Sequence, residues 1–440
     1  MQTSDPPTDL AAPSEARAIG IGTVAAFLIG RRAAIERIAA SRAALWIGAV
    51  FVISAGLARE YDQEYLVREP WYVLLPMAAS LVVSGLIFVA VGLATRWRTD
   101  GSSVPAAYGS FLALFWMTAP LAWLYAIPYE RFLDPATATE ANLWTLAVVA
   151  AWRVVLITRV ISVWAHMHPV AAFFIVMLPA DIAALIMNEL SPVPLPAVMG
   201  GVRASDVDAM IWSAKMTVTT LGVLSLPVWI VGALWVLIAR NDTRRLTTRA
   251  SQRCPAARSL NWVAIASLLI WPFPLLATQQ EQRLRWQVES RFRQGDIRGG
   301  LDAMSAREPR DFPPMWHPPG RYGYSQQTVD FFDVAAVIAD HPTSAWVRAA
   351  YVGQFDGMLG DYRFWRSTSD VVRTAEILSQ LPEGAAIART TREHWHVVWD
   401  VNDEPPEYRA ALDRLMALAG QAADGSAPIT AAPSAPSHDP

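Results

Sequence analysis

The chain has 440 residues, of which 53% are hydrophobic and 17% are charged, whereas soluble globular proteins average about 45–50% apolar and about 25% charged residues. This balance excludes a single soluble domain and is typical of a membrane protein. The formal net charge of −3 gives no global basic field, so we expect no nucleic-acid partner. The single cysteine, Cys254, excludes an intrachain disulfide and any multi-cysteine metal or redox motif.

The first 42 residues are expected to precede the membrane core. Residues 1–16 contain almost no large apolar group and predict a disordered tail. Residues 17–42 predict an amphipathic interfacial segment, because the apolar run at 19–29 is too short to cross a core of about 30 Å. Residues 31–42 alternate arginine with isoleucine and alanine, which fits a helix on an anionic leaflet and equally a solvated helix leading into a span. The expected membrane-interface cations are Arg31, Arg32, Arg37, Arg42 and, near the end of a later span, Arg159.

Residues 43–278 predict an all-α fold, a polytopic transmembrane helix bundle with about seven spans. The spans are expected near residues 43–58, 72–94, 107–127, 143–164, 170–189, 217–239 and 260–278. Tryptophan and tyrosine side chains cluster near the ends of these runs, where amphipathic rings prefer the headgroup level. The lipid bilayer is therefore the first partner that the sequence predicts.

The distribution of cations predicts the orientation of the bundle. Arginines precede the first span, follow the second and crowd the loop between the sixth and seventh, so all of them fall on one side, and acidic residues gather on the other. The positive-inside rule then predicts a multi-pass protein of the inner (cytoplasmic) membrane with a cytoplasmic N-terminus. With an odd number of spans the C-terminus is extracytoplasmic, and a single miscounted span would reverse its side.

After Thr278 the composition becomes polar, and residues 279–420 predict a soluble helical extramembrane domain. An amphipathic helix at 279–294 continues from the last span, and a turn at Gly295 and Asp296 leads into a second helix at 297–306. Residues 309–328 hold too many Pro and Gly residues for regular structure. Further helices are expected at 329–340, 344–358, 369–381 and 405–419, and a disordered tail at 421–440. We predict that this domain binds an unknown protein partner.

Two charged residues inside the spans form the most informative candidate site. A charge at the centre of a membrane helix costs about 2.5–3.5 kcal/mol on insertion scales and usually has a partner. Arg153 lies midway along the fourth span and Asp181 midway along the fifth, equally far from the turn near Met167. An antiparallel hairpin would place them at one depth, so we predict an ion pair. A bridge that fixes helix register is favoured over a substrate or proton site, because no other acid or histidine lies at that depth.

Other constellations carry weaker signals. His166 and His168 have an H-x-H spacing that offers two metal ligands, but no carboxylate or thiolate stands beside them, and His394 and His396 repeat the pattern. The first outer loop contains Glu60, Asp62, Glu64 and Glu69, which suit a hard cation or general acid–base chemistry but are better explained as a solvated anionic loop. No phosphate-binding glycine loop, metalloprotease motif or nucleophile motif is present in the sequence, so no cofactor and no catalytic residue are predicted.

Three strings of the sequence are distinctive: AREYDQEYLVREPW, FLALFWMTAPLAWLYAIPYERFL and DFPPMWHPPGRYGY. With them the chain resembles an uncharacterised family of bacterial multi-spanning membrane proteins, over residues 30 to about 330. The resemblance implies a membrane architecture and no chemistry, ligand or site residue.

The leading functional hypothesis is a non-enzymatic scaffold or interaction protein whose C-terminal helical domain binds a partner near the membrane. The alternative is a transporter or channel that uses Arg153 and Asp181 between proline-kinked helices. A third hypothesis is an enzyme that acts on lipid or an envelope polymer through Glu60 and Asp62 of the outer loop.

Overall fold

The computed structural model describes residues 18–101, 103–190, 206–239, 246, 254–322, 329–361, 364–395 and 404–420. The predicted tails at 1–16 and 421–440, His396 and the arginines at 240–253 lie outside the described residues. Within the described ranges the chain is helix and loop, with two isolated parallel bridges, Ile19 with Ala256 and Thr99 with Leu246. The fold is therefore all-α, as predicted, and it divides into two compact units.

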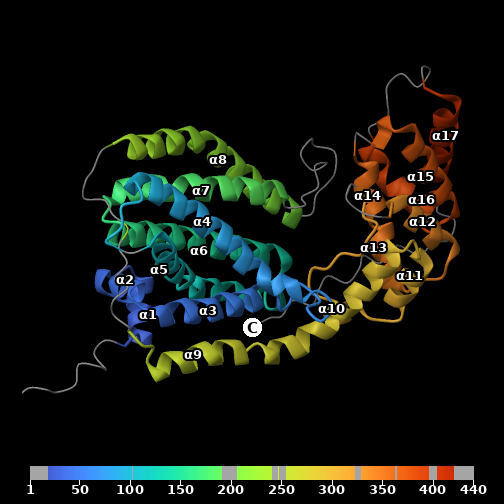
Figure 1. Cartoon of the computed structure of the whole chain (residues 1–440). Coiled ribbons are helices and arrows are strands. Elements are labelled where there is room, and N and C mark those ends of the chain that lie inside the picture. The colour runs from blue at the N-terminus through green and yellow to red at the C-terminus, as the bar shows by residue number, and fades with distance from the viewer. Residues whose placement is uncertain are drawn as a thin grey trace, which may run out of the picture. The chain divides into compact units, whose positions relative to one another are not determined.

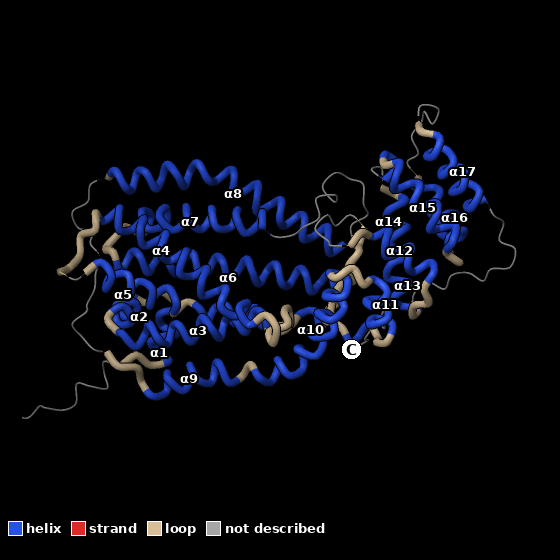
Figure 2. The backbone as a smooth tube through the Cα atoms, turned by 45° about the vertical axis from the view of Figure 1, so that its right-hand side comes forward, coloured by secondary structure: helices blue, strands red, loops and turns tan. Residues whose placement is uncertain are grey.

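Unit 1 contains the membrane bundle, formed by residues 1–193, 205–288 and 308–317. Its α-helices are α1 (Ile21–Leu28), α2 (Arg32–Ala39), α3 (Arg42–Glu60), α4 (Leu75–Thr95), α5 (Val104–Trp116), α6 (Pro135–Trp164), α7 (Pro169–Leu190), α8 (Asp206–Ile238), α9 (Arg258–Leu269) and the first part of α10 (Pro272–Arg293). Short 3₁₀ helices are η2 (Pro70–Leu74), η3 (Ala119–Ala126), η4 (Tyr129–Arg131) and η6 (Pro309–Asp311). Figures 1 and 2 show the long helices running side by side.

Seven helical segments are long and apolar enough to cross a membrane, which confirms the predicted number of spans. They cover Arg42–Glu60, Pro70–Thr95, Val104–Arg131, Pro135–Trp164, Pro169–Glu189, Ala209–Ile238 and Arg258–Arg293. Their outward surfaces are strongly apolar, since Leu224 of α8 is 70% exposed and Ile238 is 76% exposed. Such a surface is costly in water and expected against lipid.

The helix ends gather into two groups. At one end, which we call the basic end, Ser41 Oγ donates to the Cys254 carbonyl at 2.6 Å, and the Ile19–Ala256 and Thr99–Leu246 bridges tie loops from four parts of the chain together. The described arginines next to α3, α4 and α9, which are Arg42, Arg96, Arg98 and Arg258, therefore share one end of the bundle. The opposite end, the acidic end, holds the loop at 61–69, η4 and the middle of α10.

Local sequence explains where these helices begin and end. The Asp134 side chain accepts from the amides of Ala136 and Thr137 at 3.1 and 3.0 Å, and Pro135 occupies the first turn, so α6 has a strong N-terminal cap. α4 ends where Arg96 and Trp97 both adopt φ of 53°. The Trp97 ring then lies over Gly92, where a Cβ would be 2.4 Å from it, so a larger residue at this position would displace the ring.

Unit 2 has its own helices and its own core. It contains the end of α10 together with α11 (Ile297–Ser305), α12 (Phe331–Asp340), α13 (Ala345–Val352), α14 (Gln354–Leu359), α15 (Thr368–Gln380), α16 (Gly384–Thr391), α17 (Pro406–Gly420) and the 3₁₀ helices η7 (Phe364–Arg366) and η8 (Arg392–His394). Its core includes Phe331, Tyr351, Phe355, Trp365 and Tyr408, all less than 2% exposed. The Tyr408 hydroxyl donates to the Trp365 carbonyl at 3.0 Å, which connects α17 with η7.

Two predicted boundaries differ from the structure. The unit boundary falls inside α10, after Val288, rather than after Thr278, because α10 remains in contact with the bundle beyond the hydrophobic run. The single helix expected at 344–358 is two helices, α13 and α14, with Gly353 between them.

Candidate functional site

The third span is not a continuous α-helix. α5 ends at Trp116, and the span resumes as the 3₁₀ helix η3, with Pro120 in its first turn. Proline cannot donate the backbone hydrogen bond that would continue α5. η3 packs against both α3 and α6. Broken helices of this kind free backbone groups inside the membrane and occur at the binding sites of transporters.

Arg153 of α6 lies beside this break. Its guanidinium carbon is 5.7 Å from the centroid of the Phe115 ring, at the end of α5. Among the residues that the structure describes, Arg153 forms neither an ion pair nor a hydrogen bond. A cation–π contact is worth about 0.5–2 kcal/mol, which falls short of the cost of about 2.5–3.5 kcal/mol for a charge at this depth.

Asp181 has partners on a different helix. Ser225 Oγ of α8 donates to Asp181 Oδ2 at 3.3 Å, and Trp229 Nε1 donates to Ser225 Oγ at 2.8 Å. Gly222 lets the two helices approach, since a Cβ there would be 3.0 Å from Asp181 Oδ1. The predicted ion pair between Arg153 and Asp181 is therefore not formed. Equal depth did not suffice, because α6 turns Arg153 towards α5 and η3 while α7 turns Asp181 towards α8.

The first outer loop, residues 61–69, is bound by polar side chains of α10. Thr278 Oγ1 donates to the Tyr61 carbonyl at 2.6 Å, and Gln279 Nε2 donates to the carbonyls of Tyr61 and Glu64 at 3.1 and 2.9 Å. Gln279 Oε1 accepts from the Leu66 amide at 2.9 Å. Two further side chains donate to loop carbonyls: Gln282 to Asp62 and Arg285 to Gln63. We call Thr278, Gln279, Gln282 and Arg285 the α10 clamp.

The acidic residues of this loop are paired with cations or partly buried. Arg59 Nε lies 3.3 Å from Glu60 Oε1, and Arg285 Nη2 lies 3.6 Å from Glu64 Oε2. Burial, and then the nearby Glu130 carboxylate, raise the pKa of Asp62 to about 6. These contacts support a structural role for Glu60 and Glu64. Burial also raises the pKa of Glu60, while the Arg59 guanidinium opposes that rise.

A second contact joins the acidic end to α10. Arg131 of η4 forms a bidentate ion pair with Glu281, with the shorter distance 2.7 Å. The neighbouring Glu130 carboxylate accepts from the Asn142 side chain of α6. The chain around residue 130 therefore ties α6 and α10 to the same end of the bundle.

The predicted metal ligands do not gather into a larger site. His166 and His168 are both exposed in the turn between α6 and α7, and His168 Nδ1 accepts from the Val170 amide at 3.3 Å. Among the described residues no three His, Cys, Asp or Glu side chains form a group that could hold a metal ion. His394 lies in η8.

The predicted interface arginines are largely exposed, and several contact the chain. Arg32 pairs with Glu36 at 2.8 Å, Arg37 donates to Thr23 at 3.4 Å, and Arg159 donates to the Gly30 carbonyl at 3.3 Å. Arg31 and Arg42 are exposed at the starts of α2 and α3. The apolar face of α2 is buried against α5 and α6 rather than presented outward, with Ala34, Ile35 and Ile38 at most 5% exposed.

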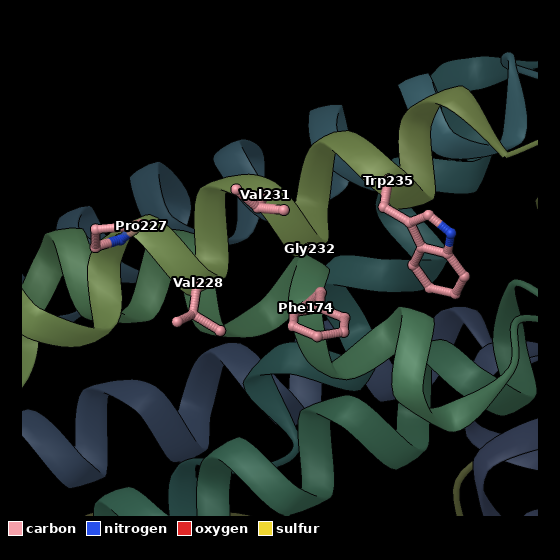
Figure 3. Close-up of a pocket in the computed structure, with 6 residues that line it drawn as sticks. All are labelled: Phe174, Pro227, Val228, Val231, Gly232 and Trp235. Atoms are coloured by element: carbon pink, nitrogen blue, oxygen red, sulfur yellow. The ribbon is translucent and has the colours of Figure 1, made fainter.

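A shallow apolar groove of about 500 Å³ lies between α7 and α8 (Figure 3). It is lined by Phe174, Pro227, Val228, Val231, Gly232 and Trp235. The Phe174 ring lies against Gly232, where a Cβ would be 2.0 Å from it. The lining carries no titratable group, so the groove offers a surface for apolar chains and no chemistry.

No family model, curated protein or solved structure matches the chain. Sequence reasoning found Arg153 and Asp181 but missed the break in the third span and the α10 clamp. Pro120 was a signal for the break, whereas no local signal connects Gln279 with the loop at 61–69.

Proposed function

We propose that this chain is a protein of the cytoplasmic membrane, with its N-terminus in the cytoplasm, whose C-terminal helical unit binds a protein partner. The observation that carries the proposal is α10, which begins within the last span and ends in unit 2 without a break in the helix. The α10 clamp attaches the first part of this helix to the loop at 61–69.

The clamp fixes the first part of α10, which belongs to unit 1, to the loop at 61–69. Each hydrogen bond contributes about 0.5–1.5 kcal/mol net, and the clamp contains at least six. The described part of unit 2 also has a core of its own, which supports an independent binding surface.

Site-specific photo-crosslinking in the full-length chain tests this proposal. A photoreactive residue is placed in turn at exposed positions of unit 2, such as Arg298 and Glu376, and at exposed positions of the bundle, such as Trp46. We expect one discrete crosslinked partner from a contiguous set of unit 2 positions and none from Trp46. Equal crosslinking from both sets, or none from unit 2, would contradict the proposal. Reporter fusions after Thr278 and at the C-terminus test the orientation.

We propose transport as a second candidate function, because the break between α5 and η3 lies beside Arg153. A cation without a carboxylate partner inside a bundle is typical of a substrate or ion pathway. The test is substrate flux in proteoliposomes with Arg153→Gln and with Arg159→Gln, an arginine of the same helix, as control. Unchanged flux in Arg153→Gln at equal protein level would count against transport.

A further inference from the structure

Asp181 is an acidic residue inside a span that forms no ion pair with the described part of the chain. It is twelve residues from Pro169, where α7 begins, and nine from Leu190, where α7 ends, which is about 18 and 14 Å at a rise of 1.5 Å per residue. Within the described ranges its polar contact is the Ser225 hydroxyl, a neutral donor. An acid at this depth usually faces a partner or a pathway, so Asp181 can serve as the counter-charge for a bound cation.

Contacts between side chains connect Asp181 with the groove between α7 and α8. Ser225, which donates to Asp181 Oδ2 at 3.3 Å, comes two residues before Pro227, where the groove begins on α8. Trp229 Nε1 donates to Ser225 Oγ at 2.8 Å, and the Trp229 ring lies 6.1 Å from the Phe174 ring of the groove wall. Asp181 itself is half-buried rather than enclosed. A continuous series of contacts therefore leads from the groove wall to an accessible carboxylate.

The groove wall combines aromatic rings with aliphatic side chains. Trp235 is 54% exposed, and its ring meets the Phe174 ring edge-on with the centroids 6.5 Å apart. Val228 and Val231 of the same wall are also exposed. In the view of Figure 3 the Phe174 ring lies between Val228 and Trp235. Aromatic faces attract quaternary cations, and aliphatic side chains suit the hydrocarbon groups that surround such a charge.

We propose that Asp181 and the α7–α8 groove bind a lipophilic organic cation, an ammonium or phosphonium ion whose charge is surrounded by hydrocarbon groups. The carboxylate supplies the opposite charge, and Phe174 and Trp235 supply aromatic faces. The groove volume of about 500 Å³ is in the range of small-molecule sites, about 300–1,000 Å³. An acyl chain of the bilayer fits the same groove but has no charge for Asp181. The inference stands apart from both proposed functions, since it involves neither unit 2 nor Arg153.

Equilibrium dialysis with radiolabelled tetraphenylphosphonium tests the proposal. The purified full-length protein is dialysed in a neutral detergent, with the same detergent concentration in both chambers. We expect saturable binding of one cation per chain. Excess triphenylphosphine oxide, a neutral molecule with a similar hydrocarbon surface, should not displace it. No saturable binding, or full displacement by the neutral molecule, would overturn the inference, because the groove would then select for apolar surface and not for charge.

Matched variants decide whether the named residues form the site. We expect Asp181→Asn to raise the Kd at least tenfold, and Glu189→Gln, a change at an exposed acid of the same helix, to leave it unchanged. Trp235→Leu should raise the Kd several-fold, whereas Trp262→Leu, at an exposed tryptophan of α9, should not. An unaltered Kd in Asp181→Asn would overturn the inference. If that variant does not fold, Trp235→Leu decides, since a Kd equal to that of Trp262→Leu overturns it as well.

Discussion

Replacement of Gln279 by glutamate tests the α10 clamp with almost no change of shape. The Gln279 side chain donates to the carbonyls of Tyr61 and Glu64 and accepts from the Leu66 amide. A glutamate keeps the acceptor but loses both donors, and it directs a carboxylate oxygen at two carbonyl oxygens. Gln280→Glu is the matched control, since it adds the same charge at the next, exposed position.

The expected cost follows from the bonds that are lost. Each is worth about 0.5–1.5 kcal/mol, and a carbonyl left without a donor costs more, so Gln279→Glu should destabilise the closed loop by about 2–3 kcal/mol. A change of 1.4 kcal/mol is a factor of ten in population, so the open state should rise about 30-fold or more. Gln280→Glu, as a surface change, should stay within about 0.5 kcal/mol.

Limited trypsin cleavage after Arg68, an exposed residue of this loop, measures the open population. When opening and closing are fast, the cleavage rate follows the equilibrium between the closed and open loop. We expect Gln279→Glu to be cleaved at least about 30 times faster than the unaltered chain in native membranes. Equal cleavage rates in Gln279→Glu and Gln280→Glu would refute the reasoning, because they would mean that the loop is not fixed by this side chain.

Three further predictions concern other parts of the chain. Burial raises the pKa of Asp62 from the ordinary 3.8 to about 6. The protonated carboxyl should therefore stabilise the folded state fully below about pH 3.8, by at most about 3 kcal/mol, and this stabilisation should disappear as the pH rises through about 6. Thermal unfolding of Asp62→Asn across this window should lack that pH dependence. Glu383→Gln should weaken the bidentate pair with Arg348, at 2.7 and 2.8 Å. We expect unit 2 to lose about 1–2 kcal/mol of stability and hydrogen exchange in α13 and α16 to rise. Unchanged exchange would show that the pair adds nothing to the stability of unit 2. Gly56→Ala should lower the stability of the fold by about 1–3 kcal/mol, because the added Cβ would lie 2.3 Å from a backbone carbonyl oxygen. Gly109→Ala is the control, since nothing lies within 4 Å of its added Cβ, and it should not destabilise α5 in the same thermal assay.

The spans were predictable because the transfer free energy of side chains determines them locally. The first span, expected at 43–58 between two arginines, is the helix Arg42–Glu60. The rotation of each helix about its axis was not predictable, since it depends on neighbours distant in sequence. The pairing of Arg153 with Asp181 failed for this reason, as Asp181 contacts α8. The boundary after Thr278 failed similarly, because the partners of the clamp precede it by more than 200 residues.

The contacts between α3 and the last span bear on how the protein is made. Ser54 Oγ donates to the Ser267 carbonyl at 2.6 Å, across 213 residues, and Trp271 Nε1 donates to Ser54 Oγ at 3.0 Å. At about 5–20 residues per second, the first helix leaves the ribosome some 10–40 s before its partner exists. Throughout that interval α3, which has a serine and an acidic residue on its inward face, lacks this partner and lies either in the bilayer or beside an insertion factor. Final closure of the bundle is therefore a late step, after synthesis of the last span.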